Sequence, residues 1–173
     1  MQLLTLLPLA ATSVLGGVLP RDTPPGIYEI RTVNGTELAP VKIGDIYHGP
    51  IIESLAARGS EGLSKRDSNG GTGRVFPNQG DYNACTNTWR AYLQGGGKVN
   101  GKTKHVVRNG IAEIVGCNYN NEQWAPPPQT VDQFNAVMDN SYGAWNTGWV
   151  YSDAYHWTFW RDLTGQVNYC SNI

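Results

Sequence analysis

A pair of basic residues, Lys65-Arg66, divides the chain into two parts of different composition, and only the second carries the bulky side chains of a compact core. All six tryptophans and all three cysteines lie after residue 66. Residues 19–66 contain neither type, and they carry six basic and six acidic side chains. Because aromatic side chains supply much of the apolar area of a small core, we expect the working domain to lie in residues 67–173.

The surroundings of Lys65-Arg66 are typical of a site that a kexin-type processing protease cuts. Such an enzyme binds two adjacent cations in acidic subsites, and its substrate enters the cleft as an exposed, extended chain. Serine and glycine are frequent around the pair, from Gly62 to Gly71. We therefore predict cleavage after Arg66, with a kexin-type protease as a partner of the precursor.

The N-terminal residues 1–18 contain no charged side chain. Their apolar run from Leu3 to Leu15 is shorter than the ~20 residues that span a membrane. This pattern is typical of a secretory signal peptide, and no other stretch is long enough to predict a membrane span. The chain is predicted to be a secreted, extracellular protein with three parts: a signal peptide over 1–18, a propeptide over 19–66, and a mature domain over 67–173 in which 67–73 are flexible.

Within the predicted propeptide, Asn34-Gly35 separates an alternating run over 27–33 from a second run over 36–43. Asn-Gly between two such runs predicts a β-hairpin. Asn34-Gly35-Thr36 is also the one N-glycosylation sequon of the chain, so we predict a glycoprotein precursor modified at Asn34.

Residues 67–173 show the periodicities of both helices and strands. Helices are expected over 82–93 and 131–141, where apolar side chains recur at spacings of three and four. Strands are expected at 74–76, 102–108, 111–118, 148–152, 157–162 and 166–170. The predicted fold class is α+β, a small antiparallel sheet with two helices packed on one face, stapled by one disulfide.

Three cysteines allow one bridge with one free thiol, or a further bridge between two chains. Cys85 is expected on the inward face of the first helix and Cys117 at the end of a strand, so we predict a Cys85–Cys117 bridge. Cys170 is then free, and a Cys85–Cys170 bridge is the alternative. The cysteines lack the close spacing of a zinc site, so no metal or other cofactor is expected.

This layout resembles the fungal small secreted cysteine-containing proteins of the effector and killer-toxin-like group. The similarity is carried by the strand–turn–strand string over 107–119 that ends in Cys-Asn-Tyr, by Gly-Trp-Val at 148–150, and by the closing Tyr169-Cys170. Members of this group often carry a further cysteine near 141–143, where this chain has Ser and Tyr. The resemblance implies a toxin-like or effector role after propeptide removal, without a single activity.

The densest aromatic cluster lies over 145–160. If 157–162 is a strand, Trp157 and Trp160 point to opposite faces, so at least one ring is exposed. Exposed Trp and Tyr rings beside Asn and Asp stack on sugar rings, and they equally suit a protein partner or core packing. We predict that the protein binds a host protein or a cell-surface or cell-wall glycan through Trp149, Tyr151, Trp157 and Trp160.

The alternative function is that of a small secreted RNase-like hydrolase, which needs an acid, a base and a cation near the phosphate. The candidate catalytic residues are His105, Glu113, Arg108 and His156. The chain has no G-x-S-x-G or H-E-x-x-H motif, and its net charge of −1 gives no electrostatic footprint for nucleic acid. We therefore expect a binding protein rather than an enzyme.

Overall fold

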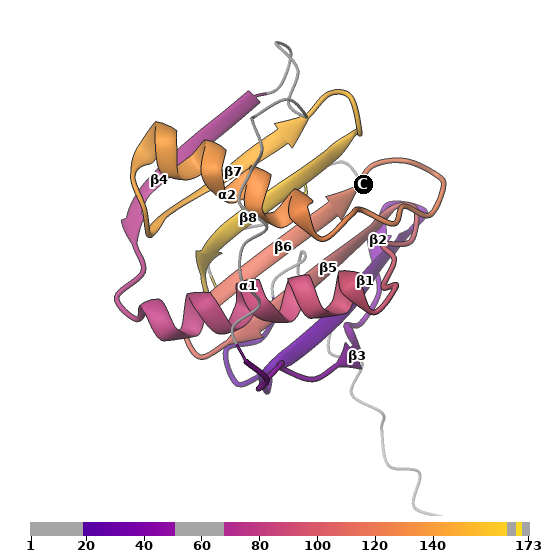
Figure 1. The fold of residues 1–173 in the computed structure, drawn as a ribbon. Coiled ribbons are helices and arrows are strands. Elements are labelled where there is room, and N and C mark those ends of the chain that lie inside the picture. Colours follow the sequence, from indigo (N-terminus) through magenta and orange to yellow (C-terminus); the bar gives the residue numbers. More distant parts are fainter. Residues whose placement is uncertain (1–18, 51–67, 166–168, 171–173) are drawn as a thin grey trace, which may run out of the picture.

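The computed structural model describes residues 19–50, 68–165 and 169–170 (Figure 1). The predicted signal peptide over 1–18 and the predicted processing pair Lys65-Arg66 lie outside these residues. Of the predicted last strand, 166–170, only the final two residues are described.

Two helices and eight strands make up the described part of the chain. The helices are α1 (Gln79–Gln94) and α2 (Gln129–Tyr142). The strands are β1 (Gly26–Val33), β2 (Thr36–Glu37), β3 (Val41–Gly44), β4 (Ser68–Val75), β5 (Thr103–Asn109), β6 (Ala112–Asn118), β7 (Asn146–Ser152) and β8 (Trp157–Leu163). All strand pairs are antiparallel in the order β2-β1-β5-β6-β8-β7-β4, and β3 also pairs with β1. Figure 1 shows both helices in front of the same face of the sheet.

The sheet is much larger than the sequence predicts. The predicted fold class, two helices on a small sheet, is wrong because eight strands dominate the fold. Three of these strands, β1 to β3, come from residues 19–66, the predicted propeptide. β1 pairs with β5 over six residues, from Gly26 opposite Arg108 to Arg31 opposite Thr103. Because β1 and β5 are far apart in the sequence, no local sequence pattern predicts that they pair.

The glycine-rich start of the predicted mature domain also differs from its prediction. The prediction of flexibility over 67–73 is wrong where the structure describes it, since Ser68–Val75 form β4 and pair with β7. A Cβ atom on Gly70 would lie 2.6 Å from Nε1 of Trp149, and one on Gly71 would lie 2.7 Å from the ring of Tyr142. The glycines make room for aromatic rings that lie against the strand.

The core between the helices and the sheet holds the side chains that helical spacing predicts. α1 contributes Cys85, Trp89 and Leu93, and α2 contributes Val131, Phe134 and Met138. Successive side chains of a strand point to opposite faces. Ile114 of β6 therefore faces the helices, while Val115 belongs to a second core on the face of the sheet away from the helices, which we call the far face.

The disulfide joins Cys117 to Cys170, with 5.8 Å between their Cα atoms, and the buried Cys85 is free. The predicted Cys85–Cys117 bridge is therefore wrong. Alternation along β6 explains the difference, because Cys117 points to the far face whereas Cys85 packs between the sheet and the helices. The Cys85 thiol instead donates to the carbonyl oxygen of Ala112 at 3.5 Å.

Glu29 of β1 forms a buried polar cluster under α1. Its carboxylate accepts hydrogen bonds from His105 Nε2 at 3.0 Å, from Arg31 Nε at 2.6 Å and from Asn100 Nδ2 at 2.6 Å. The hydrogen bond from His105, with smaller contributions from Arg31 and Asn100, lowers the pKa of Glu29 to about 2, although burial acts in the opposite direction.

We expect Glu29→Gln to lower the free energy of unfolding by roughly 2 kcal/mol at neutral pH, because the amide replaces a charged acceptor. A depressed pKa stabilises the fold above the unfolded pKa, and this contribution is lost as the pH falls from about 5 to about 2. The difference between wild type and variant should therefore shrink over that range in urea unfolding curves. A difference that stays constant with pH would contradict the assignment.

Candidate functional site

The residues of the predicted hydrolase site do not come together. His105 is 0% exposed, points toward the helices and stacks on the ring of Trp89, with 6.1 Å between ring centroids and 26° between the ring planes. Arg108 and Glu113 pair directly across β5 and β6 on the far face, where Arg108 Nε donates to Glu113 at 2.7 Å. His156 is exposed in the turn between β7 and β8. The sheet thus separates the imidazole of His105 from the Arg108–Glu113 pair.

Arg108 and Glu113 form a buried structural cluster. The guanidinium of Arg108 also donates to the carbonyl oxygens of Leu19 and Pro20, and the hydroxyl of Tyr169 donates to Glu113 Oε2 at 3.1 Å. Burial raises the pKa of Glu113, while the charge of Arg108 opposes this shift. Both side chains have their hydrogen bonds within the protein, which fits a structural role.

Three of the four predicted binding residues line one pocket on the far face. Trp149 and Tyr151 come from β7, and Trp160 comes from β8. The fourth, Trp157, is 1% exposed and packs against Trp89 and Phe134 in the core under the helices. The pocket has a volume of about 550 Å³, and its lining consists of Ser68, Tyr119, Trp149, Tyr151, Thr158, Trp160 and Cys170. We call it the aromatic pocket.

Strand register sets the geometry of the aromatic pocket. Trp149 is directly opposite Trp160 across β7 and β8, and Tyr151 is opposite Thr158. The two indole centroids are 5.7 Å apart with the rings inclined at 36°, while the rings of Tyr119 and Tyr151 are 6.1 Å apart and inclined at 73°. Two pairs of half-buried aromatic rings thus lie next to each other on one face of the sheet.

Hydroxyl groups accompany these rings. Thr158 Oγ1 donates to the hydroxyl oxygen of Tyr119 at 3.2 Å, and the hydroxyl of Tyr151 shares a hydrogen bond with His156 Nδ1 at 3.1 Å. Burial raises the pKa of Tyr119, so its hydroxyl stays protonated at neutral pH. The lining residues that the structure describes include no charged side chain. The pocket therefore offers flat apolar surfaces with neutral polar groups.

Sequence reasoning missed Ser68, Tyr119, Thr158 and Cys170 as pocket residues. Thr158 lies on the same face of its strand as Trp160, so alternation alone predicts that it lies beside this binding candidate. Ser68 and Tyr119 reach the pocket from β4 and from the end of β6, and their positions depend on which strands are neighbours.

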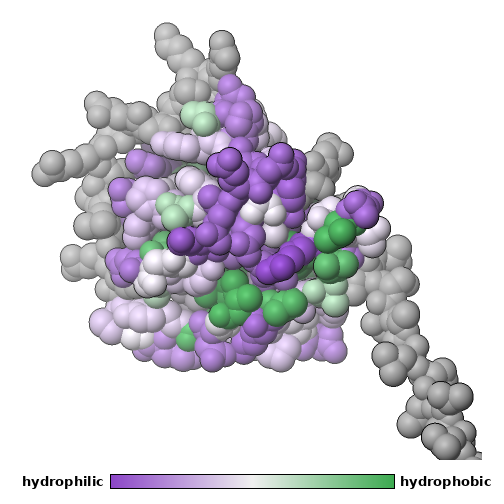
Figure 2. Space-filling model, turned by 90° about the vertical axis from the view of Figure 1, so that its right-hand side faces the viewer, coloured by the Kyte–Doolittle hydropathy of each residue, from purple (hydrophilic) through white to green (hydrophobic). Residues whose placement is uncertain are grey.

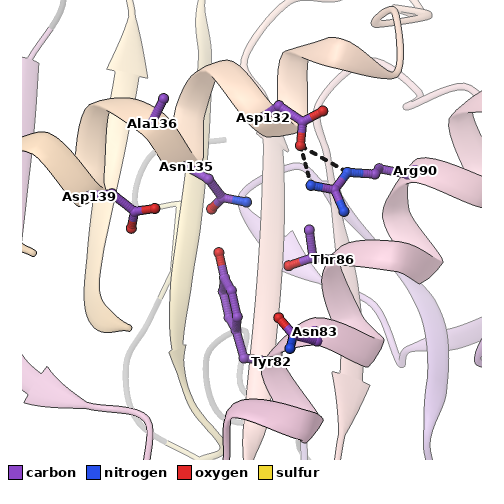
Figure 3. Close-up of a pocket in the computed structure, with 8 residues that line it drawn as sticks. All are labelled: Tyr82, Asn83, Thr86, Arg90, Asp132, Asn135, Ala136 and Asp139. Carbon is purple, nitrogen blue, oxygen red and sulfur yellow. Dashed lines mark hydrogen bonds and ion pairs between the residues drawn. The ribbon is translucent and has the colours of Figure 1, made fainter. Parts of the chain in front are cut away.

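A second pocket lies in the groove between α1 and α2, and its volume is about 290 Å³ (Figure 3). Its lining consists of Tyr82, Asn83, Thr86, Arg90, Asp132, Asn135, Ala136 and Asp139. Arg90 Nε donates to Asp132 at 2.9 Å, and Arg161 donates to Asp139 at 2.6 Å. Because its charges are already paired and it contains one aromatic ring, this groove is the weaker candidate for a binding site.

No family model, curated protein or solved structure matches the chain. The described residues contain no group of three or more His, Cys, Asp or Glu side chains that could hold a metal ion. Neither helix of the described part is long and apolar enough to cross a membrane. The choice of function therefore depends on the aromatic pocket.

Proposed function

We propose that this chain is a secreted precursor whose product acts by binding, and that the aromatic pocket takes a sugar ring of a neutral cell-surface or cell-wall glycan. The observation that carries this proposal is the pairing of Trp149 with Trp160 beside the Tyr119–Tyr151 pair, in a pocket whose described lining residues carry no charge.

The chemistry of a pyranose ring fits these groups. Its C–H face packs on aromatic rings, while its hydroxyl groups need hydrogen-bond partners at the edge. Trp149 provides the ring face, and Tyr119 and Thr158 provide hydroxyl groups. The volume of about 550 Å³ lies within the range of small-molecule sites. Among the described residues, Nε1 of Trp160 has no hydrogen-bond acceptor, so a ligand oxygen that reached it would satisfy a buried donor.

The absence of charge in the lining favours neutral sugars over acidic ones. An anionic glycan or a nucleic acid normally binds through Arg or Lys, which supply charge-assisted hydrogen bonds. Among the described residues, the pocket lining has neither. We therefore expect binding to neutral hexose or N-acetylhexosamine oligomers, with little dependence on salt concentration.

Trp149→Ala should weaken glycan binding about tenfold or more, because it removes a stacking surface. The matched control is Tyr155→Ala, which removes an exposed ring that stacks on Trp124 outside the pocket and should leave the affinity unchanged. A glycan array with the secreted protein, followed by calorimetric titration of the best ligand, measures both. If no neutral glycan binds, or if both variants weaken binding equally, the proposal is wrong.

A host protein is the second candidate partner, and a different surface favours it. Exposed apolar side chains gather around β1 to β3, namely Val33, Leu38, Val41 and Ile43. Figure 2 views the molecule from the right-hand side of Figure 1, where these strands lie, and shows hydrophobic side chains grouped among hydrophilic ones. Such patches often mark protein-binding sites. Binding that Val41→Asp abolishes and Trp149→Ala leaves intact would favour this candidate.

A further inference from the structure

We infer that residues 19–50 stay bound to residues 68–173 after the chain is cut behind Arg66, so that the processed protein consists of two chains sharing one sheet. This inference rests on the proposed processing at Lys65-Arg66. It assigns a permanent structural role to a segment that the sequence marks as a propeptide to be lost.

The first support is the depth at which β1 is embedded. It forms six antiparallel residue pairs with β5, and its residues from Gly26 to Ile30 are all buried. Ile27 belongs to the core under the helices, together with Ile46 of the same segment. On the other side of the sheet, Leu19, Tyr28 and Ile30 pack in the core of the far face with Val106 and Val115. The segment thus contributes to both cores.

The second support is the set of polar contacts between the segment and the side chains of β5. The ammonium group of Lys104 is fully buried and pairs with Glu37, and His105 pairs with Glu29. Arg108 donates to the carbonyl oxygen of Leu19 at 2.8 Å. Lys104, His105 and Arg108 of β5 therefore each have a hydrogen-bond partner in residues 19–50. Removing one partner of a buried ion pair such as Lys104–Glu37 strongly destabilises a fold.

The third support is the exposed edge that β5 would have if the segment dissociated. β5 would become an edge strand with unpaired backbone groups, flanked by the apolar side chains of Val106 and Val107. Exposed apolar edges of this kind drive aggregation. Because all three cysteines lie after residue 66, no disulfide links the two pieces, and their association is non-covalent.

The test uses the secreted precursor, residues 19–173, and a purified kexin-type protease. After cleavage we expect a single peak in native size-exclusion chromatography, and two chains from that peak in denaturing mass spectrometry. Loss of the 19–66 piece from the native peak would overturn the inference. If the protease leaves the chain intact, the proposed processing fails. A variant with a different protease site in place of 60–66 then provides the cut and still decides whether the segment is retained.

A pair of matched variants in β1 tests the cause of retention. Ile30→Ala removes a fully buried side chain from the far-face core, whereas Val33→Ala shortens a side chain of the same strand that is 50% exposed. After cleavage, the segment should dissociate at least tenfold faster from Ile30→Ala than from wild type, and Val33→Ala should behave as wild type. Equal dissociation from both variants would contradict the packing argument.

Discussion

A chain that begins at Asp67, and so lacks β1 to β3, is expected not to form a stable monomer. β5 loses six paired residues, and Lys104, His105 and Arg108 lose the partners that the segment provides. Ile27 and Ile46 also leave the core under the helices. The free energy of unfolding of a domain is only about 5–15 kcal/mol, so the loss of these strand pairs, polar partners and core side chains together should abolish cooperative folding.

Near-ultraviolet circular dichroism and thermal unfolding measure this effect directly, because the tryptophans of the core report on fixed packing. Addition of a separate peptide spanning 19–50 should restore the signal, while a peptide carrying Ile30→Asp should not. A sharp unfolding transition of the 67–173 chain alone, as a monomer, would show that the segment is dispensable.

Removing the disulfide is expected to have the second largest effect. The Cys117–Cys170 bridge joins residues separated by 53 positions, and the chain-entropy model gives about 4 kcal/mol for a loop of this length. The double variant Cys117→Ala/Cys170→Ala should lower the free energy of unfolding by that amount in denaturant titrations. It should also loosen the aromatic pocket, because Cys170 is part of its lining.

Cys85→Ala is the matched control for the disulfide. Its thiol is free and buried, so the substitution removes one sulfur from the core and should cost only about 1 kcal/mol. Burial raises the pKa of Cys85, which keeps the thiol protonated and poorly reactive. Intact-mass measurement after alkylation of the native protein should therefore show no modification. If Cys85→Ala and the double variant destabilise the protein equally, the bridge pairing is wrong.

Part of the candidate site follows from local sequence patterns. Alternation over 148–152 and 157–162 places Trp149 and Tyr151 on one face of a strand, and Trp157 and Trp160 on opposite faces. Alternation does not reveal which face of the sheet the helices cover. The sequence therefore predicts Trp157 as a binding residue, although its side chain lies in the core beside Phe134.

The candidate catalytic residues of the hydrolase hypothesis show the same limit of local patterns. His105, Arg108 and Glu113 flank one hairpin in the sequence, and their proximity along the chain suggests a shared site. The strand period of two sends His105 to the helices and the other two to the far face. Their polar groups form buried hydrogen bonds with residues 19–50 and with Tyr169.

What the sequence determines by itself is local. The Asn34-Gly35 turn forms as predicted, with positive φ angles of 51° and 74°, because these two residues tolerate the left-handed conformation that a two-residue hairpin requires. Both helices and the hairpin of β5 and β6 also follow from spacing within a few residues. The tertiary structure alone decides that β1 joins β5 and that Cys117 pairs with Cys170. These contacts join distant segments, and their choice depends on strand register and on the face each side chain occupies, which periodicity does not encode.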